Sequence, residues 1–361
     1  MKNYIHILLL VLAAMSVSTV CARNNSSGRK YLVAGVAFYN LENLFDTINN
    51  NGKYDVEFTP DGSRKWDTQK YRSKIANLAR TITSMASAST PNGPAVLGVS
   101  EVENCSVLED LVEEVDCQLV ASGRNPWNLR IVHHDSPDRR GIDVACLYNP
   151  AIFSYISDEL FPLHIDSEPD LKTRDQLCVT GSIGGDTICI IVNHWPSRLG
   201  GQERSSHLRE AAAQLCKDIS QRVWDEHPDR GVIIMGDLND DPQDTSCAKI
   251  LGARKNSSSV AVHGFYNPFW SMLDKGIGTL AYNGSWNLFD QIIVSGTLLE
   301  RFNPDNLHYR SCKVLNFEFL RIQEGDHRGG PFRTYSGGVF LNGYSDHFPT
   351  EIFLVKPRTN D

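Results

Sequence analysis

Short apolar runs and longer amphipathic stretches alternate along the chain, a pattern typical of α/β proteins. The apolar runs predict strands at residues 31–39, 95–100, 129–133, 142–148, 152–156, 177–183, 187–193, 232–235, 288–294 and 351–355. Apolar positions at helical spacing predict helices at residues 68–87, 105–116, 205–226 and 245–251. Neither a repeat nor a long low-complexity linker interrupts this order, so we expect one domain over residues 31–357. Within it, residues 300–343 are rich in polar, Gly and aromatic residues and are expected to form an insertion or lid.

The run Val232–Met235 has no alternation and therefore predicts a strand that is buried on both faces. It is followed directly by Gly236-Asp237-Leu238-Asn239. Side chains at i and i+2 of an extended chain lie on the same side, so Asp237 and Asn239 would be presented together at the end of the strand. Gly, Asp and Asn are also common turn residues. This segment alone therefore does not distinguish a turn from a functional site.

Polar or ionisable side chains stand at the ends of six predicted strands. They are Asn40 with Glu42, Glu101, Asn193 with His194, Asp237 with Asn239, Asp290, and Asp346 with His347. Each of them alone is an ordinary polar loop end. As a set, acids, amides and imidazoles placed where apolar strands stop would gather at one rim of a sheet, where functional groups are usually carried.

The composition is that of a soluble globular protein, with 41% hydrophobic and 22% charged residues among 361. The formal net charge is −8, and the sequence contains no basic run that would follow a long DNA backbone. An acidic chain has no general attraction for nucleic acid or for an anionic membrane. Any phosphate binding would therefore depend on a local cluster or on a metal ion.

The N-terminus has the organisation of a secretory signal peptide. A positive charge precedes an almost entirely apolar stretch at residues 5–14, and Val20-Cys21-Ala22 offers small residues for cleavage. We expect cleavage after Ala22, export to the periplasm or the cell exterior, and a disordered leader at residues 23–30. The alternative is a lipoprotein signal that uses Cys21, which Val20 fits poorly because such signals place a small residue before the Cys. No other apolar run is long enough to cross a bilayer.

The cysteines give no metal or redox signature. Nine are present, one of them in the signal segment, and none stands in a Cys-x-x-Cys arrangement. Cys146, Cys178 and Cys189 lie in apolar runs that resemble strands, where we expect them to pack as small hydrophobic residues. The spacing assigns no disulfide pair.

Seven segments, taken together, resemble the endonuclease/exonuclease/phosphatase superfamily, whose members have the DNase I-like fold. The segments are Tyr39-Asn40-Leu-Glu42-Asn43-Leu, Ser100-Glu101-Val-Glu103-Asn104, Arg140-Gly-Ile-Asp143-Val, Asn193-His194-Trp-Pro, Gly236-Asp237-Leu-Asn239, Phe289-Asp290-Gln-Ile and Ser345-Asp346-His347. They occur in the family's order from about Tyr31 to Val355, and they are most similar to secreted bacterial members, including extracellular nucleases. The resemblance implies a four-layer α/β/β/α sandwich, in which two mixed sheets pack face to face and helices lie outside.

The resemblance also implies a metal site. It places the family's main metal ion on Glu101, with Glu42 or Asn40 beside it and Asp346 facing the metal or the nucleophile. Mg²⁺ prefers oxygen ligands and keeps several waters, so Mg²⁺ is the expected cofactor, with Mn²⁺ and Ca²⁺ as alternatives. Such an ion would neutralise a phosphate oxygen and the charge that develops on the leaving group.

The same chemistry suggests roles for the other strand-end residues. Asp237 is expected to activate a water, and Asn239 to hold the phosphate or that water. His347 is expected to donate to a phosphate oxygen, with Asp290 as the carboxylate that keeps it protonated. The sequence does not decide whether Asp237 or the Asp290–His347 pair is the base.

Four more residues are expected to contact the phosphate. His194 and Asn193 are the first candidates, although a His before a Trp could instead be a core residue. Arg174 and Arg198 could each clamp a phosphate through two parallel hydrogen bonds. Arg174 could equally be a solvated loop charge.

Asp143 lies inside a predicted strand, and a buried carboxylate needs a partner. Arg139 and Arg140 are the nearest candidates, and we predict a structural pair between Asp143 and Arg140 that supports the site. Arg140 would also lie close enough to contact the substrate. His133 and His134 match no motif of the family and are expected to be structural or exposed.

These features together predict an exported, divalent-metal-dependent phosphodiester hydrolase that acts as a monomer on a phosphodiester substrate, with nucleic acid the expected one. A phospholipase C-like or sphingomyelinase-like enzyme and a phosphomonoester hydrolase share this chemistry and are the enzymatic alternatives. A catalytically inactive surface binding protein is the alternative from another class. The intact set of Glu101, Asp237, Asn239, Asp290 and His347 argues against it.

Overall fold

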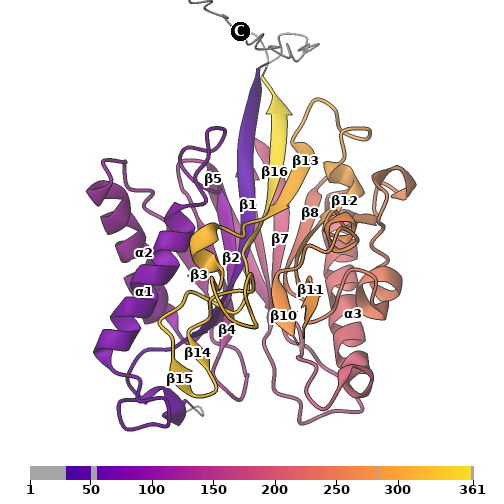
Figure 1. The fold of residues 1–361 in the computed structure, drawn as a ribbon. Helices are drawn as coiled ribbons and strands as arrows, with labels where there is room; N and C mark the ends of the chain where they lie inside the picture. The colour runs from indigo at the N-terminus through magenta and orange to yellow at the C-terminus, as the bar shows by residue number, and fades with distance from the viewer. Residues whose placement is uncertain (1–29, 50–54, 283, 359–361) are drawn as a thin grey trace, which may run out of the picture.

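Two six-stranded sheets form where the apolar runs of the sequence pair with one another (Figure 1). The computed structural model describes residues 30–49, 55–282 and 284–358. The first sheet has the order β13 (His308–Val314), β16 (Thr350–Pro357), β1 (Tyr31–Leu44), β2 (Val96–Val102), β4 (Asp143–Tyr148), β3 (Arg130–His133). The second has the order β5 (Phe153–Phe161), β6 (Gln176–Ile183), β7 (Asp186–His194), β8 (Gly231–Asp237), β12 (Asp290–Ser295), β9 (Phe265–Tyr266).

Both sheets are mixed, and their registers bring the polar strand ends to one edge. β1 pairs with β2 in parallel, with Asn40 opposite Ser100, and β7 pairs with β8 in parallel, with His194 opposite Asp237. β12 runs antiparallel to β8 and begins at this edge, with Asp290 opposite Asp237. β1 begins and β16 ends at the top of Figure 1, so the polar strand ends lie at the lower edge of the sheets.

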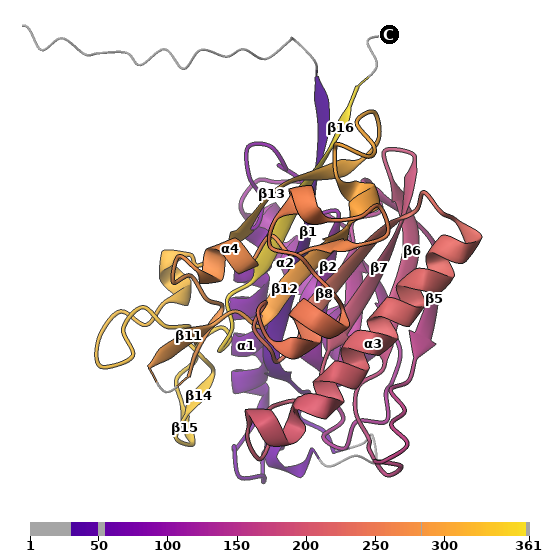
Figure 2. The ribbon, with the colours of Figure 1, turned by 90° about the vertical axis from the view of Figure 1, so that its right-hand side faces the viewer.

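The sheets pack face to face, and helices cover the outer faces (Figures 1 and 2). One core cluster lies between the sheets and includes Phe38, Val192 and Met235. Helices α1 (Thr68–Thr83) and α2 (Cys105–Ala121) form a second core with the outer face of the first sheet. Helix α3 (Gln202–Glu226) forms a third core on the second sheet. The predicted four-layer sandwich is confirmed.

The predicted cysteine packing agrees with these cores. Cys146 lies in the core between the sheets. Cys178 and Cys189 lie in the core beneath α3, with their Sγ atoms 2.7 Å apart across the β6–β7 hairpin.

The prediction that residues 300–343 form an insertion or lid is wrong for β13, which is an edge strand of the first sheet. Leu307 and Leu315 flank it and are buried, so the burial of apolar side chains at both ends holds this strand against β16. The segment that follows contains only short elements: η5 (Glu318–Leu320), β14 (Tyr335–Ser336) and β15 (Val339–Phe340).

The remaining elements are short and lie between the main strands. They are η1 (Val56–Phe58), η2 (Ser246–Ile250), η3 (Ser257–Ser259), α4 (Trp270–Leu273), the hairpin strands β10 (Leu280–Tyr282) and β11 (Ser285–Asn287), and η4 (Gly296–Leu298). The short helix predicted at residues 245–251 is a single π-helical turn, η2.

The predicted signal peptide, residues 1–22, and the predicted leader up to residue 29 lie outside the described residues. Among the helices that the structure describes, none combines the length and the apolar character needed to span a bilayer.

Candidate active site

The side chain of Asn40 joins the two sheets at the edge where the polar strand ends meet. Its Nδ2 atom lies 3.0 Å from Oδ2 of Asp237 and 3.4 Å from Oε1 of Glu101. Its Oδ1 atom accepts a hydrogen bond from the backbone N–H of Glu42 at 2.9 Å. Asn40 is fully buried, so these contacts fix two carboxylates from different sheets next to each other.

Glu101 owes its position to an irregular strand end. Its φ angle is 61°, in the left-handed region, and the β2–β4 register shifts between Ser100 and Val102. Such a bulge turns a side chain out of the regular alternation and is often found beside functional sites. The Glu101 carboxylate also accepts from the backbone N–H of Asn43 at 2.9 Å, which holds it at the rim with a side-chain exposure of 14%.

His347 is held between two buried carboxylates. Its Nδ1 atom lies 2.7 Å from Oδ2 of Asp290, and its Nε2 atom lies 3.8 Å from Oδ2 of Asp237. Burial lowers the pKa of His347, but the carboxylates of Asp290 and Asp237 outweigh it and keep this pKa well above its ordinary value. His347 is therefore a cation at neutral pH, with Nε2 directed at the centre.

His194 also approaches Asp237 and has the opposite protonation state. Its Nε2 atom is 3.6 Å from Oδ2 of Asp237 and 3.9 Å from Oε1 of Glu101. Burial, followed by the positive charges of Arg174 and Arg140, lowers the pKa of His194 well below its ordinary value. Burial also raises the pKa of Asp237 to about 6, against the opposing effect of cationic His347. At neutral pH ionised Asp237 thus has one imidazolium and one neutral imidazole as neighbours.

Glu42, a predicted metal ligand, faces away from Glu101. Its carboxylate accepts from the backbone N–H of Thr334 at 2.7 Å and lies 3.8 Å from Nζ of Lys74 and 3.4 Å from Nε of Arg333. We correct its role: the carboxylate is buried, unlike that of Asp346, and its hydrogen bond and its two cationic neighbours make it an anchor for the segment around residue 334.

Asp346 reaches the rim of the centre but is paired there. Its Oδ2 atom is 2.7 Å from Nη2 of Arg333, and its Oδ1 atom is 3.9 Å from Nε2 of His347. Its side chain is 30% exposed. Asp346 is therefore accessible to an ion at the centre once Arg333 gives up its contact.

The two predicted amides differ in what they can reach. Asn193 is fully buried, donates to the carbonyl oxygens of Ile191 and Met235, and accepts from the indole of Trp195. We correct its role from phosphate ligand to support of the strand ends, because its hydrogen-bonding atoms are all used within the fold. Asn239 is half-buried at the rim, where its backbone N–H donates to Oδ1 of Asp237 at 3.0 Å.

The arginine predictions are corrected as well. Arg174 is buried and donates to Oδ2 of Asp138 and to the carbonyl oxygens of His194 and Trp195. It is thus neither a solvated loop charge nor a free phosphate clamp. Arg198 donates to the carbonyl oxygen of Asn239, and to the carboxylates of Asp240 and Asp244. Both guanidiniums hold the loops that carry the centre, because carboxylates and carbonyls of those loops already occupy them.

The predicted Arg140–Asp143 pair does not form. Asp143 is fully buried and takes its hydrogen bonds from Ser136, by backbone and hydroxyl, while His133 lies 3.2 Å away. Arg140 is exposed, which leaves it available to a substrate. His134 pairs with Asp158 at 2.6 Å, away from the residues of the centre.

The donor set fits a hard divalent cation. Glu101 offers carboxylate oxygen atoms at the rim, whereas the side-chain oxygen of buried Asn40 already accepts from the backbone N–H of Glu42. The buried Oδ1 atom of Asp290 has no hydrogen-bond partner among the described residues. Ligand atoms of Asp237, Asp290 and His347 also lie within 4.8 Å of one another. Because the Asp290–His347 contact already uses two of these, Glu101 is the better place for Mg²⁺. Asn40, a predicted ligand, presents its Nδ2 atom to Glu101 and Asp237, and we correct its role to positioning these two carboxylates.

Sequence reasoning missed Lys74 and Arg333, the cations beside Glu42. Lys74 lies within a predicted amphipathic helix, and Arg333 follows a Gly-rich loop segment. Neither position carries a local signal, because their role depends on contacts with Glu42 that folding creates between separate elements, and the contact of Arg333 spans 291 residues. A buried Lys on an apolar helix face could only have suggested that an acidic partner exists.

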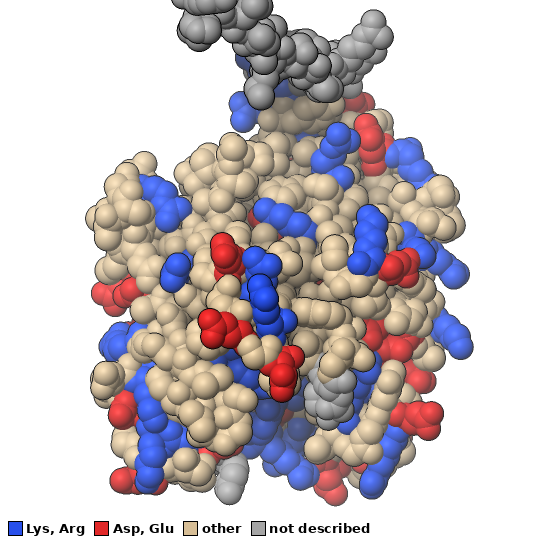
Figure 3. All heavy atoms as spheres, viewed as in Figure 1, with Lys and Arg blue, Asp and Glu red and all other residues tan. Residues whose placement is uncertain are grey.

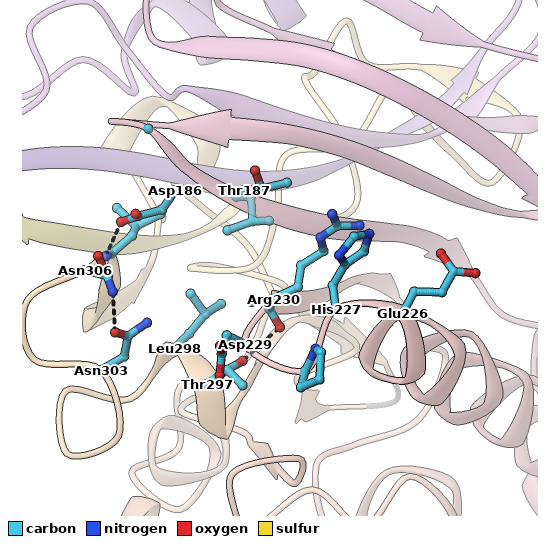
Figure 4. A pocket seen from close by; sticks show the side chains of 15 residues that line it. Asp186, Thr187, Glu226, His227, Asp229, Arg230, Thr297, Leu298, Asn303 and Asn306 are labelled. Carbon is cyan, nitrogen blue, oxygen red and sulfur yellow. Dashed lines mark hydrogen bonds between the residues drawn. The ribbon is translucent and has the colours of Figure 1, made fainter.

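A cavity of about 460 Å³ adjoins the centre, with Arg333 and Asp346 in its lining. A second cavity, of about 410 Å³, lies where β8 begins and includes Asp186, His227 and Arg230 (Figure 4). Asp237 is six residues further along β8, about 20 Å at ~3.3 Å per residue. Only the first cavity can therefore serve the candidate active site.

The face seen in Figure 3 carries acidic and basic side chains interspersed. This distribution agrees with the sequence-based conclusion that phosphate binding depends on local groups. An extended electrostatic track for a duplex would need one sign of charge over a continuous stripe.

Comparison with solved structures shows the same fold in several proteins. TDP2 from D. rerio with 14 humanising mutations has a TM-score of 0.52 and 13% identity, over 89% of this chain and 98% of that one. An endonuclease/exonuclease/phosphatase family protein from Bacteroides thetaiotaomicron has a TM-score of 0.51 and 16% identity, over 91% and 100%. A mannosyl-6-phosphatase from Bacteroides thetaiotaomicron has a TM-score of 0.51 and 17% identity, over 89% and 99%.

Identities this low show a shared fold and no more, and no curated protein matches the sequence. The family comparison is more specific. Residues 35–356 match the model of the Endonuclease/Exonuclease/phosphatase family. The chain therefore belongs to the endonuclease/exonuclease/phosphatase family of metal-dependent hydrolases, which act on phosphoester bonds.

Proposed function

We propose that the chain is an exported phosphodiesterase that uses Mg²⁺ to cleave nucleic acid and acts as a monomer. The observation that carries this proposal is the placement of cationic His347 and neutral His194 near the same carboxylate oxygen of Asp237, beside the accessible carboxylate of Glu101. All these groups come from one chain. The apolar stretch at residues 5–14 supports export.

Each residue has a role that its geometry supports. Asp237, ionised at neutral pH, accepts the proton of the attacking water. His347 donates a hydrogen bond from Nε2 to a phosphate oxygen, and Asp290 keeps it protonated and oriented. His194 and Asn239 contact the phosphate or the water. Mg²⁺ held by Glu101 would supply charge neutralisation at the phosphate.

A substrate panel tests this function. The mature chain is incubated with Mg²⁺ and plasmid DNA, single-stranded DNA, RNA, sphingomyelin, a phosphoinositide or a phosphomonoester. We expect cleavage of nucleic acid that EDTA abolishes and added Mg²⁺ restores. If only the lipids or the phosphomonoester are hydrolysed, nucleic acid is not the substrate. Full activity in EDTA would show that hydrolysis does not depend on a divalent metal ion.

A further inference from the structure

The cavity beside the centre is built by two segments that lie far apart in the sequence. One wall is the β10–β11 hairpin, with Ala281 and Trp286, and the other is the segment around Ile322, Pro331 and Phe332. The volume of about 460 Å³ lies within the range of ~300–1,000 Å³ that holds a small molecule. One monomer unit of a polymer would fit there, whereas a base-paired segment would not.

The cavity opens directly onto the candidate catalytic groups. Asp346 belongs to its lining and lies 3.9 Å from Nε2 of His347. The hairpin wall is tied to the same segment, because Trp286 stacks on Phe348 with ring centroids 6.0 Å apart. The backbone N–H of Phe348 also donates to the carbonyl oxygen of Thr279 at 2.7 Å. A group bound in the cavity would therefore lie next to a phosphate at the centre.

The lining combines an aromatic wall with a guanidinium. Trp286 is 37% exposed although Phe348 stacks against it, so part of its indole surface remains free for a ligand. Arg333 stands at the inner end, where its Nε and Nη2 atoms contact Glu42 and Asp346. Its Nη1 atom makes no hydrogen bond within the part of the chain that the structure describes. Aromatic stacking and a free N–H donor suit a flat ring that is linked to a phosphate.

We propose that this cavity is a subsite for the single nucleoside next to the scissile phosphate, with its base against Trp286 and its phosphate near Arg333. The inference rests on the proposed nuclease function and restricts the substrate of that nuclease. A base enters the cavity only when it is unpaired, since extracting one from a duplex costs a few kcal/mol. The preferred substrate is therefore single-stranded nucleic acid or a frayed strand end.

Two phosphodiesters with the same leaving group, one with a nucleoside and one without, measure how much the subsite contributes to cleavage. They are thymidine 5′-(p-nitrophenyl phosphate) and methyl p-nitrophenyl phosphate, and the readout is the ratio of their kcat/KM values with Mg²⁺. Base stacking on an aromatic residue is worth about 1–3 kcal/mol, so we expect the chain to prefer the nucleotide ester by roughly tenfold or more. Trp286→Ala should lower the ratio about tenfold, and Trp286→Phe should lower it less.

A variant that fills the cavity gives an independent check. Ala281→Trp should also lower the ratio, because the added side chain would occupy the space of the base. Phe302→Ala removes an exposed aromatic residue outside the cavity and should leave the ratio unchanged. Equal ratios in the parent, Trp286→Ala and Ala281→Trp would overturn the subsite, as would faster cleavage of duplex than of single-stranded DNA.

Binding without turnover separates this inference from the proposed function. Thymidine 5′-monophosphate should quench the tryptophan fluorescence of the parent in the absence of metal, with a loss of that response in Trp286→Ala. If neither ester is hydrolysed but the quenching is present, the nuclease function fails while the subsite stands. If both esters are cleaved but the nucleotide gives no quenching and no preference, the subsite fails.

Discussion

At the scale of single residues, burial and neighbouring charge give the two histidines of the centre opposite protonation states. His347 gains two carboxylate neighbours and stays cationic, whereas His194 is buried near two arginines and stays neutral. Asp237 lies near both, with a pKa of about 6. A base that is ionised at neutral pH and a cationic donor are the pair that general acid–base catalysis requires.

The first prediction concerns these two groups. Asp237→Asn and His347→Gln should each lower kcat with Mg²⁺ by at least about 100-fold, because each removes a proton-transfer or charge-stabilising group. Circular dichroism should show an intact fold in both. Asp241→Asn, an acid four residues beyond Asp237 and outside the centre, is the matched control and should stay within a few-fold of the parent. Near-parental turnover of either centre variant would refute the assigned roles.

The second prediction concerns Asp241 and the pH dependence of stability. Burial raises the pKa of Asp241 from 3.8 to about 6 in the folded chain. Its ordinary pKa applies in the unfolded chain, so the unfolded state ionises first as the pH rises, and the folded state loses stability between about pH 4 and 6. Above that window both states are ionised and the loss is constant.

Asp241→Asn should remove this loss, because an amide does not titrate and still accepts from the backbone N–H of Leu288. Relative to the parent, the variant should gain on the order of 1–3 kcal/mol in the free energy of unfolding between pH 4 and 6. Urea unfolding at several pH values measures the difference. A difference that does not change with pH would show that Asp241 does not titrate in this range.

At the scale of elements, helix α1 holds the segment that closes one side of the centre. Lys74 of α1 is fully buried and donates to Oγ1 of Thr334 at 2.7 Å and to the carbonyl oxygen of Tyr344 at 2.6 Å. Its Nζ atom also lies 3.8 Å from the carboxylate of Glu42. Burying the charged ammonium group of Lys74 without partners would be unfavourable, and these hydrogen bonds and the nearby carboxylate offset that desolvation cost.

The third prediction follows from this contact. Lys74→Met should destabilise the fold by about 3–5 kcal/mol, because it leaves the buried carboxylate of Glu42 short of one cation. Lys70→Met, one turn earlier on the same helix and partly exposed, is the control and should cost less than about 1 kcal/mol. Guanidinium unfolding measures the loss in the free energy of unfolding for each variant. Equal losses would show that the buried contacts of Lys74 do not stabilise the fold more than those of Lys70.

At the scale of the whole molecule, the two sheets pack tightly against each other at Gly98, where the first sheet lacks a side chain. A Cβ atom on Gly98 of β2 would lie 2.5 Å from Sδ of Met235 and 3.2 Å from Phe38 and Val192. Tight packing at this point sets the separation of the sheets and hence the position of Glu101 relative to Asp237.

The fourth prediction tests this dependence. Gly98→Val should overpack the core and destabilise the fold by about 1–3 kcal/mol, with a lower kcat as the sheets move apart. Adding Met235→Ala should recover part of both losses, because it removes the atom that a new side chain would meet first. Thermal unfolding and turnover are measured on the single variants and the double. Strict additivity would mean that the two positions do not share this space.

The sequence by itself determined the strands, the helices and the polar residues at the strand ends. Those features are local: the period of apolar residues decides the element, and a polar residue beside an apolar run marks its end. The family match and the four-layer fold agree with that interpretation. The sequence did not predict edge strand β13, because its residues are only partly buried and do not alternate regularly between buried and exposed positions. No periodic signal therefore distinguishes it from a loop.

Only the tertiary structure decided which polar residues face the centre and which serve the fold. Glu42 and Asn193 sit in the same kind of strand-end motif as Glu101 and His194, yet the first binds Lys74 and Arg333 and the second binds backbone carbonyls. Arg174 is buried for the same reason, since a carboxylate and two carbonyls were within reach. The residue type fixes what a side chain can bind, but burial and the partners that folding brings to it fix what it does bind.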